Sequence, residues 1–167
     1  MDNCPEPADN PVENPGPVLV GELNPYGADP RLALFDEPAH SAGGRMRRLI
    51  CGLHPSTYRA LSRYNLCVGT WDSSRALAKA LHLQRSCRGR LLILLGRKVS
   101  ASFGLHRVAP FTLVRPDDDT RMLLLPHPSG RCRVWSDPQA LLLARGALQR
   151  ACPEVQWGEA DPVVVRR

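Results

Sequence analysis

One short stretch near the start of the chain is the best guide to its fold: Val18-Leu19-Val20-Gly21-Glu22-Leu23-Asn24-Pro25-Tyr26-Gly27. It begins with an apolar run that follows a proline, and it ends in a turn that carries an amide and a phenol close to a carboxylate. This pattern predicts a buried β-strand over residues 17–23, followed by a polar turn. Because sites in open α/β sheets form just outside the carboxyl ends of strands, we expect the turn to be one wall of a functional site.

A second strand end of this kind lies late in the chain. The apolar run Met122–Leu125 is followed by Pro126-His127-Pro128-Ser129-Gly130-Arg131. The tripeptide His-Pro-Ser also occurs at residues 54–56, between two helical patterns, where Ser56 is expected to cap a helix. Only the later copy follows a strand pattern, which favours His127 as the functional histidine.

Strand and helix patterns alternate along the chain. Apolar runs typical of buried strands cover residues 17–23, 64–68, 91–95 and 121–125, with a further strand candidate at 111–114. Helices are predicted at residues 45–52, 56–61 and 97–103, after a cap at Ser73 or Ser74 with Leu77, Ala80 and Leu81 on the apolar face, and from Ser136 onward. Residues 41–44 are expected to lie in a long loop, where they would break regular structure. We therefore expect the α/β class, a three-layer α/β/α sandwich around a central, mostly parallel four-stranded sheet.

The composition suits one basic domain. Of the 167 residues, residues 1–16 are rich in Pro, Asn and acidic side chains and are expected to form a flexible leader before a single domain over residues 17–167. The net charge of +6 rests mainly on arginine. Arginine favours phosphate-rich partners, because a guanidinium can donate two parallel hydrogen bonds to phosphate. The alternative is a basic composition with no binding role.

Several classes of protein are disfavoured. None of the six cysteines forms a C-x-x-C pair, which argues against zinc ribbons and iron–sulfur sites. The run of aspartates at residues 117–119 lies in a predicted turn, where contiguous carboxylates are usually solvated, so no metal or cofactor is expected. The chain has no signal-peptide pattern and no apolar run of about 18 residues. We expect a cytoplasmic monomer with reduced thiols and no membrane contact.

In their order along the chain, four segments resemble the motifs of the uracil-DNA glycosylase superfamily. Gly21-Glu22-Leu23-Asn24-Pro25 is similar to the motif after the first strand, and the loop around His127 is similar to the last motif. Between them, Arg63–Cys67 resembles the strand whose asparagine reads a pyrimidine, and Leu92–Lys98 resembles a Leu-Gly strand-to-helix junction. The resemblance covers about residues 17–150, nearly the whole chain.

This resemblance implies a monofunctional DNA glycosylase that hydrolyses the N-glycosidic bond of uracil or a modified pyrimidine and leaves an abasic site. Asn24 would hold the attacking water, and His127 would donate a hydrogen bond to the departing base. Asn24 matches the mismatch-specific and single-strand-selective branches, and we expect slow turnover because an amide is not an effective general base. Two alternatives remain for the general base. Glu22 could act as the general base, although alternation along the strand could turn it away from Asn24. Otherwise no side chain takes this role.

The remaining site residues would bind the base and the DNA. A base in a duplex must be flipped out to reach such a pocket. Asn65 would then read its edge, Phe35 would stack on it, and Tyr26 would lie against the pyrimidine C5 position and exclude thymine. DNA-binding residues are expected in the loop after the last strand: Ser129, Gly130, Arg131 and Arg133.

Other functions fit parts of the sequence. Asn24-Pro25 can be a plain turn, and the same fold can serve as a non-catalytic nucleic-acid-binding module. An α/β hydrolase using Glu22, His127 and Asp36 would lack the G-x-S-x-G nucleophile elbow. A free nucleoside or nucleotide is an alternative substrate to DNA.

Overall fold

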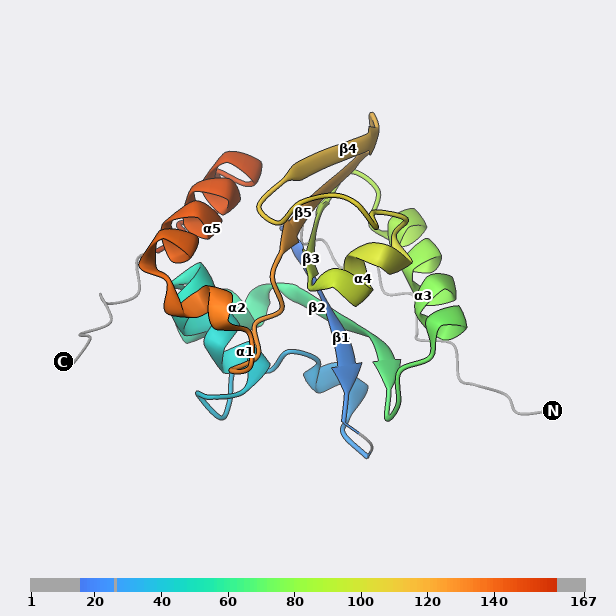
Figure 1. Ribbon diagram of the computed structural model, residues 1–167, viewed down its shortest axis with the longest axis horizontal. Helices are drawn as coiled ribbons and strands as arrows, with labels where there is room; N and C mark the ends of the chain where they lie inside the picture. The colour runs from blue at the N-terminus through green and yellow to red at the C-terminus, as the bar shows by residue number, and fades with distance from the viewer. Residues whose placement is uncertain (1–15, 26, 159–167) are drawn as a thin grey trace.

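Five strands form the central sheet of the computed structural model, which describes residues 16–25 and 27–158 (Figure 1). They are β1 (Val18–Asn24), β2 (Ser62–Val68), β3 (Leu91–Leu95), β4 (Leu113–Asp117) and β5 (Thr120–Leu125), in the spatial order β2-β1-β3-β5-β4. All neighbouring pairs are parallel except β4 and β5, which are antiparallel. The predicted mixed α/β class and mostly parallel sheet are confirmed. The predicted number of four strands was too low, because β4 folds back beside β5 and adds an edge strand.

Helices flank both faces of this sheet. On one side lie α3 (Ser73–Ser86) and α4 (Arg97–Ser102), and on the other lie α5 (Pro138–Ala151) and the group formed by α1 (Ala42–Arg45), the π-helix η2 (Met46–Cys51) and α2 (Pro55–Ala60) (Figure 1). Two short 3₁₀ helices complete the described chain, η1 (Pro30–Leu32) and η3 (Arg133–Ser136). Within the described ranges, no helix is both long enough and apolar enough to span a membrane.

The central strand β3 explains why its sequence is an unbroken aliphatic run. Leu91, Ile93 and Leu95 pack in one core cluster, whereas Leu92 and Leu94 pack in the cluster on the opposite face. Since successive side chains of a strand alternate between faces, a strand covered by helices on both sides has no polar face.

Three predicted helix starts were displaced by one or two residues. The α3 helix is capped by Asp72 rather than by Ser73 or Ser74, because the Asp72 carboxylate accepts a hydrogen bond from the Arg75 amide at 2.9 Å. Likewise His54, not Ser56, caps α2, and Asp137, not Ser136, caps α5. In each case the true cap is a polar side chain directly before the helix, so it meets the unpaired amides of the first turn.

The predicted apolar face of α3 was right at Ala80 and wrong at Leu77 and Leu81. Leu77 and Leu81 are about half exposed, while Ala76, Ala80 and Leu83 are buried. The helix therefore turns its small alanines and Leu83 toward the sheet, whereas Leu77 and Leu81 lie outside.

Residues 41–44, predicted to lie in a loop and break regular structure, instead begin a helix. Ser41 Oγ accepts a hydrogen bond from the Gly44 amide at 3.0 Å and caps α1. Glycine is needed at position 43 because a Cβ there would lie 2.1 Å from the Phe35 carbonyl oxygen. This close approach brings the start of α1 against the loop that carries Phe35.

Candidate functional site

A cavity of about 430 Å³ opens where β1 and β5 end. Its lining includes five of the residues singled out in the sequence: Glu22, Asn24, Phe35, Asn65 and His127. They come from β1, β2, the loop before α1 and the loop after β5, which are far apart in the chain. Tyr26 lies outside the described residues. The other four predicted site residues, Ser129, Gly130, Arg131 and Arg133, follow His127 and are not part of the lining.

Asn24 and Asn65 form a pair on neighbouring strands. Asn65 lies opposite Gly21 in the β1–β2 register, and its Nδ2 donates a hydrogen bond to Asn24 Oδ1. Asn24 is only 4% exposed, and its backbone carbonyl accepts a hydrogen bond from the Gly69 amide at 2.8 Å. A carbonyl oxygen has two lone pairs, so Oδ1 can still accept one further hydrogen bond, and the Asn24 NH₂ group can donate. This side chain can therefore hold a water molecule in a fixed position.

Gly21 makes room for this pair, and replacing it with alanine should destabilise the protein. A Cβ at Gly21 would lie 2.1 Å from Asn65 Oδ1 and 3.1 Å from two side-chain carbons of Leu34. We expect Gly21→Ala to lower the free energy of unfolding by about 1–3 kcal/mol, the usual cost of overpacking, and to displace the Asn65 amide. Urea unfolding would measure the loss. Gly146→Ala is the matched control, because its added methyl would meet only the flexible end of Arg150; equal stabilities for the two variants would contradict the prediction.

His127 is held as a neutral donor. The Ser129 amide donates to its Nδ1 at 3.2 Å, so in the neutral ring the proton lies on Nε2. Burial lowers the pKa of His127; the Glu22 carboxylate acts in the opposite direction, and the Lys98 ammonium adds to the lowering. The ring is therefore uncharged at pH 7 and can donate its Nε2 proton.

The loop that carries His127 is anchored by hydrogen bonds to its backbone carbonyls. Trp135 Nε1 donates to the His127 carbonyl at 2.9 Å, and Arg45 Nε donates to the Pro128 carbonyl at 3.0 Å. A Cβ at Gly96 would lie 3.1 Å from His127 Cβ, so the glycine that ends β3 lets this loop pack closely. Trp135 was not singled out in the sequence, and its hydrogen bond to this loop was missed.

Glu22 faces the same cavity as Asn24, because residues two apart on a strand share a face. The sequence argument that alternation could turn Glu22 away was therefore wrong. Its Oε1 accepts a salt bridge from Lys98 Nζ at 2.8 Å, and Lys98 Nζ also lies 5.2 Å from the centre of the Trp71 ring. A carboxylate has two oxygens, so this ion pair leaves Oε2 for a water molecule in the cavity.

Lys98 was missed as a site residue. It lies two residues after Gly96, at the strand end that already stood out in the sequence, and this position was the one signal that could have found it.

The loop that presents Phe35 is fixed by buried polar contacts. Asp36 is 1% exposed and lies between Arg47 Nε at 3.0 Å and Arg59 Nε at 2.8 Å. The Arg59 guanidinium lies 5.1 Å from the centre of the Phe35 ring, and Tyr58 Oη donates to the Leu34 carbonyl at 2.9 Å. Asp36 is thus used to anchor the loop and does not line the cavity, which disfavours a hydrolase that relies on it.

The segment after His127 is exposed and basic. Arg131 and Arg133 are exposed, and neither guanidinium has a hydrogen bond or ion pair to another residue in the described ranges. Gly130 faces open space, while Ser129 contributes its amide to His127. The roles of these residues toward DNA stay predictions.

Neither a protein-family description nor a curated protein matches the chain.

Proposed function

We propose that the protein is a monofunctional DNA glycosylase similar to the uracil-DNA glycosylase superfamily, with the three-layer α/β/α sandwich of that group. It would hydrolyse the N-glycosidic bond of uracil or a modified pyrimidine in DNA. The observation that carries the proposal is the meeting of Glu22, Asn24, Asn65 and His127 around one cavity at the carboxyl ends of parallel strands. Such an edge is where sites form in open α/β sheets.

His127 would stabilise the departing base. When the N-glycosidic bond breaks, its electron pair leaves with the pyrimidine, and negative charge develops on a carbonyl oxygen of the base. A fixed donor aimed at that oxygen lowers the barrier without having to reorganise during the reaction. The neutral ring of His127, with its proton on Nε2, supplies such a donor.

Water would be the nucleophile. Asn24 would hold the water while its oxygen forms a bond to the sugar C1′ and the bond from C1′ to the base nitrogen breaks. The proton released from water would pass to Glu22, whose carboxylate shares the cavity with Asn24. An amide cannot accept this proton near pH 7, which is why Glu22 is assigned the role of base.

Base recognition would use the remaining residues of the cavity. Asn65 offers a donor and an acceptor to the edge of a flipped pyrimidine, and Phe35 offers a ring on which the base stacks. Arg131 and Arg133 would bind phosphates near the mouth, with the backbone at Ser129 and Gly130. Tyr26, outside the described residues, is proposed to exclude thymine.

Replacing Glu22 with glutamine should slow the reaction while keeping the shape of the side chain. We expect a fall in the rate of base release at the lower end of the about 10²–10⁴-fold that general bases contribute, because one carboxylate oxygen is already paired with Lys98. Single-turnover kinetics on a uracil-containing oligonucleotide would measure it. Glu154→Gln, at an exposed glutamate outside the cavity, is the control, and an unchanged rate for Glu22→Gln would show that Glu22 is not the base.

The proposal itself is tested by base release. The protein is incubated with single strands and with U:G and U:A duplexes, and with oligonucleotides that carry deaminated or hydroxymethylated pyrimidines. Alkali then cleaves any abasic site. Product from at least one substrate is expected; no product from any of them would refute the proposed catalysis.

A non-catalytic nucleic-acid-binding module is the second candidate. The observation that favours it is the Asn24–Asn65 pair, in which the two amides that should hold water and base are bonded to each other. This alternative predicts DNA binding that weakens steeply with salt, with no release of base.

A further inference from the structure

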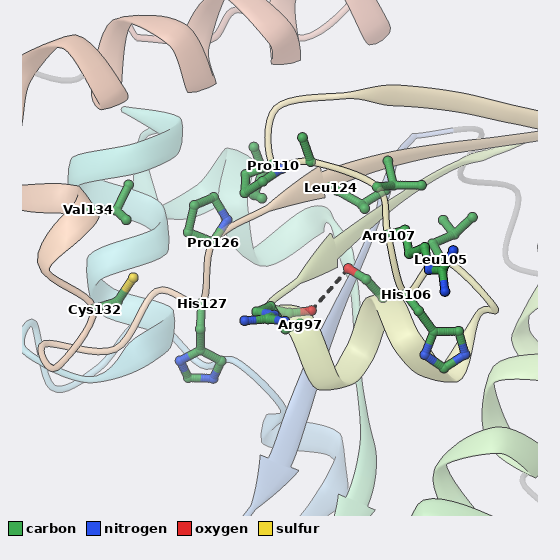
Figure 2. A pocket seen from close by; sticks show the side chains of 15 residues that line it. Arg97, Leu105, His106, Arg107, Pro110, Leu124, Pro126, His127, Cys132 and Val134 are labelled. Atoms are coloured by element: carbon green, nitrogen blue, oxygen red, sulfur yellow. Dashed lines mark hydrogen bonds between the residues drawn. The ribbon is translucent and has the colours of Figure 1, made fainter.

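A second cavity, of about 620 Å³, adjoins the candidate site. It is bounded by the start of α4, the segment from residue 105 to residue 110, and the chain that follows β5 (Figure 2). His127 lines both cavities, so they adjoin at this residue. Neither the catalytic steps nor base recognition as described above use this second cavity.

The charges around the second cavity differ from those of the first. Its lining includes Arg97, His106 and Arg107 but no carboxylate, whereas the first cavity includes Glu22 and Glu37. Arg97 and Arg107 are exposed, and neither guanidinium has a hydrogen bond or an ion pair to any residue that the structure describes. Two unpaired guanidiniums beside a cavity without carboxylates favour an anionic occupant.

The interior of the second cavity is mainly apolar. Leu105, Pro110, Leu124 and Pro126 line it, and in the view of Figure 2 Arg97 lies between His127 and His106. Apolar walls with exposed imidazole and guanidinium planes offer faces on which a nucleobase can stack, and the arginine charges can bind the attached phosphate. The occupant that fits is therefore planar and anionic, which describes a nucleotide.

We propose that this second cavity binds a nucleotide next to the target nucleotide on the same DNA strand. The inference rests on the proposed function, in that the first cavity holds the target base. Because His127 lines both cavities, their two occupants would lie beside each other, as neighbouring nucleotides on a flexible strand do. Stacking of this kind tolerates any base, so the cavity would add affinity without strict sequence preference.

Variants of the exposed rim test this proposal by DNA affinity. Arg107→Glu reverses a charge at the cavity, and Ala109→Glu adds a carboxylate at an exposed position of its lining. Arg115→Glu, on β4 and outside both cavities, is the matched control for the charge reversal. Fluorescence anisotropy with a labelled single-stranded oligonucleotide should show affinity reduced by about tenfold or more for the two cavity variants and by about twofold for the control. Unchanged melting temperatures would verify that all three variants fold.

The results of the affinity and base-release experiments distinguish the proposal from its alternatives. Equal losses for all three variants, or no loss at the cavity, would overturn the proposal. A free mononucleotide that binds as tightly as the oligonucleotide, in a manner sensitive to Arg107→Glu, would assign the cavity to free nucleotides and overturn the claim about the strand. If the cavity variants lose affinity while no substrate releases a base, the proposed catalysis fails and the second nucleotide site stands.

Discussion

Replacing His127 with alanine is expected to slow base release by about 10²–10³-fold, the usual effect of losing one fixed donor to a developing anion. Burial lowers the pKa of this histidine, and the Ser129 amide bonded to Nδ1 leaves the proton on Nε2, so the donor is present in the neutral ring at pH 7. Single-turnover rates at saturating protein would report the chemical step. The loss should appear in that rate rather than in DNA affinity.

The other His-Pro-Ser segment supplies the control for this experiment. His54 is exposed and caps α2, away from both cavities. His54→Ala should lower stability by about 0.5–2 kcal/mol through loss of the helix cap, with an unchanged rate of base release below the unfolding temperature. Equal rates for His127→Ala and His54→Ala would remove His127 from the reaction.

Replacing Asp36 with alanine is expected to lower the free energy of unfolding by about 3–5 kcal/mol, the usual cost of removing one partner of a buried ion pair. Asp36 is 1% exposed and serves both Arg47 and Arg59, and Arg47 would keep a largely buried charge without its partner. Urea unfolding followed by circular dichroism would measure the change. Phe35 should also lose its fixed position, so base release should fall even where the variant is folded.

Asp29→Ala is the matched control for Asp36→Ala. Asp29 forms an exposed ion pair with Arg31 at 2.8 Å, and such pairs contribute little because water screens them. Asp29 also caps the short η1 helix through the Arg31 amide, so its removal should lower the free energy of unfolding, but by much less than Asp36→Ala. Similar losses for both aspartates would show that the buried pairs are no more important than the exposed one.

The parts of the fold that could be predicted are those that depend on local periodicity. The run Leu91–Leu95 has no polar face, and this alone identified a strand covered on both sides. The caps failed because Asp72 and Asp137 compete with neighbouring serines for the same role, and the sequence alone does not indicate which of the two meets the free amides. The strand candidate at residues 111–114 was not counted in the sheet, because the pairing of β4 depends on its hairpin with β5 rather than on its own pattern.

The candidate site likewise has residues that the local sequence pattern could predict and contacts that depend on tertiary packing. Asn24, Asn65 and His127 could be found because each lies on a strand or directly after one, and parallel strands bring such positions to one edge of the sheet. The ion pair between Glu22 and Lys98 could not, because it depends on how α4 packs beside β1. Asp36 was considered as a catalytic carboxylate, since nothing in the sequence indicates that two arginines enclose it.

The anchoring of the loop after β5 has a consequence for how tightly a strand can bind. Trp135 and Arg45 restrain the backbone carbonyls of His127 and Pro128 before any ligand arrives. The conformational entropy of this loop is therefore lost during folding rather than during association, and binding does not bear the free-energy cost of ordering it. Trp135 and Arg45, which have no assigned contact to base or phosphate, would in this way contribute to DNA affinity by keeping the loop rigid.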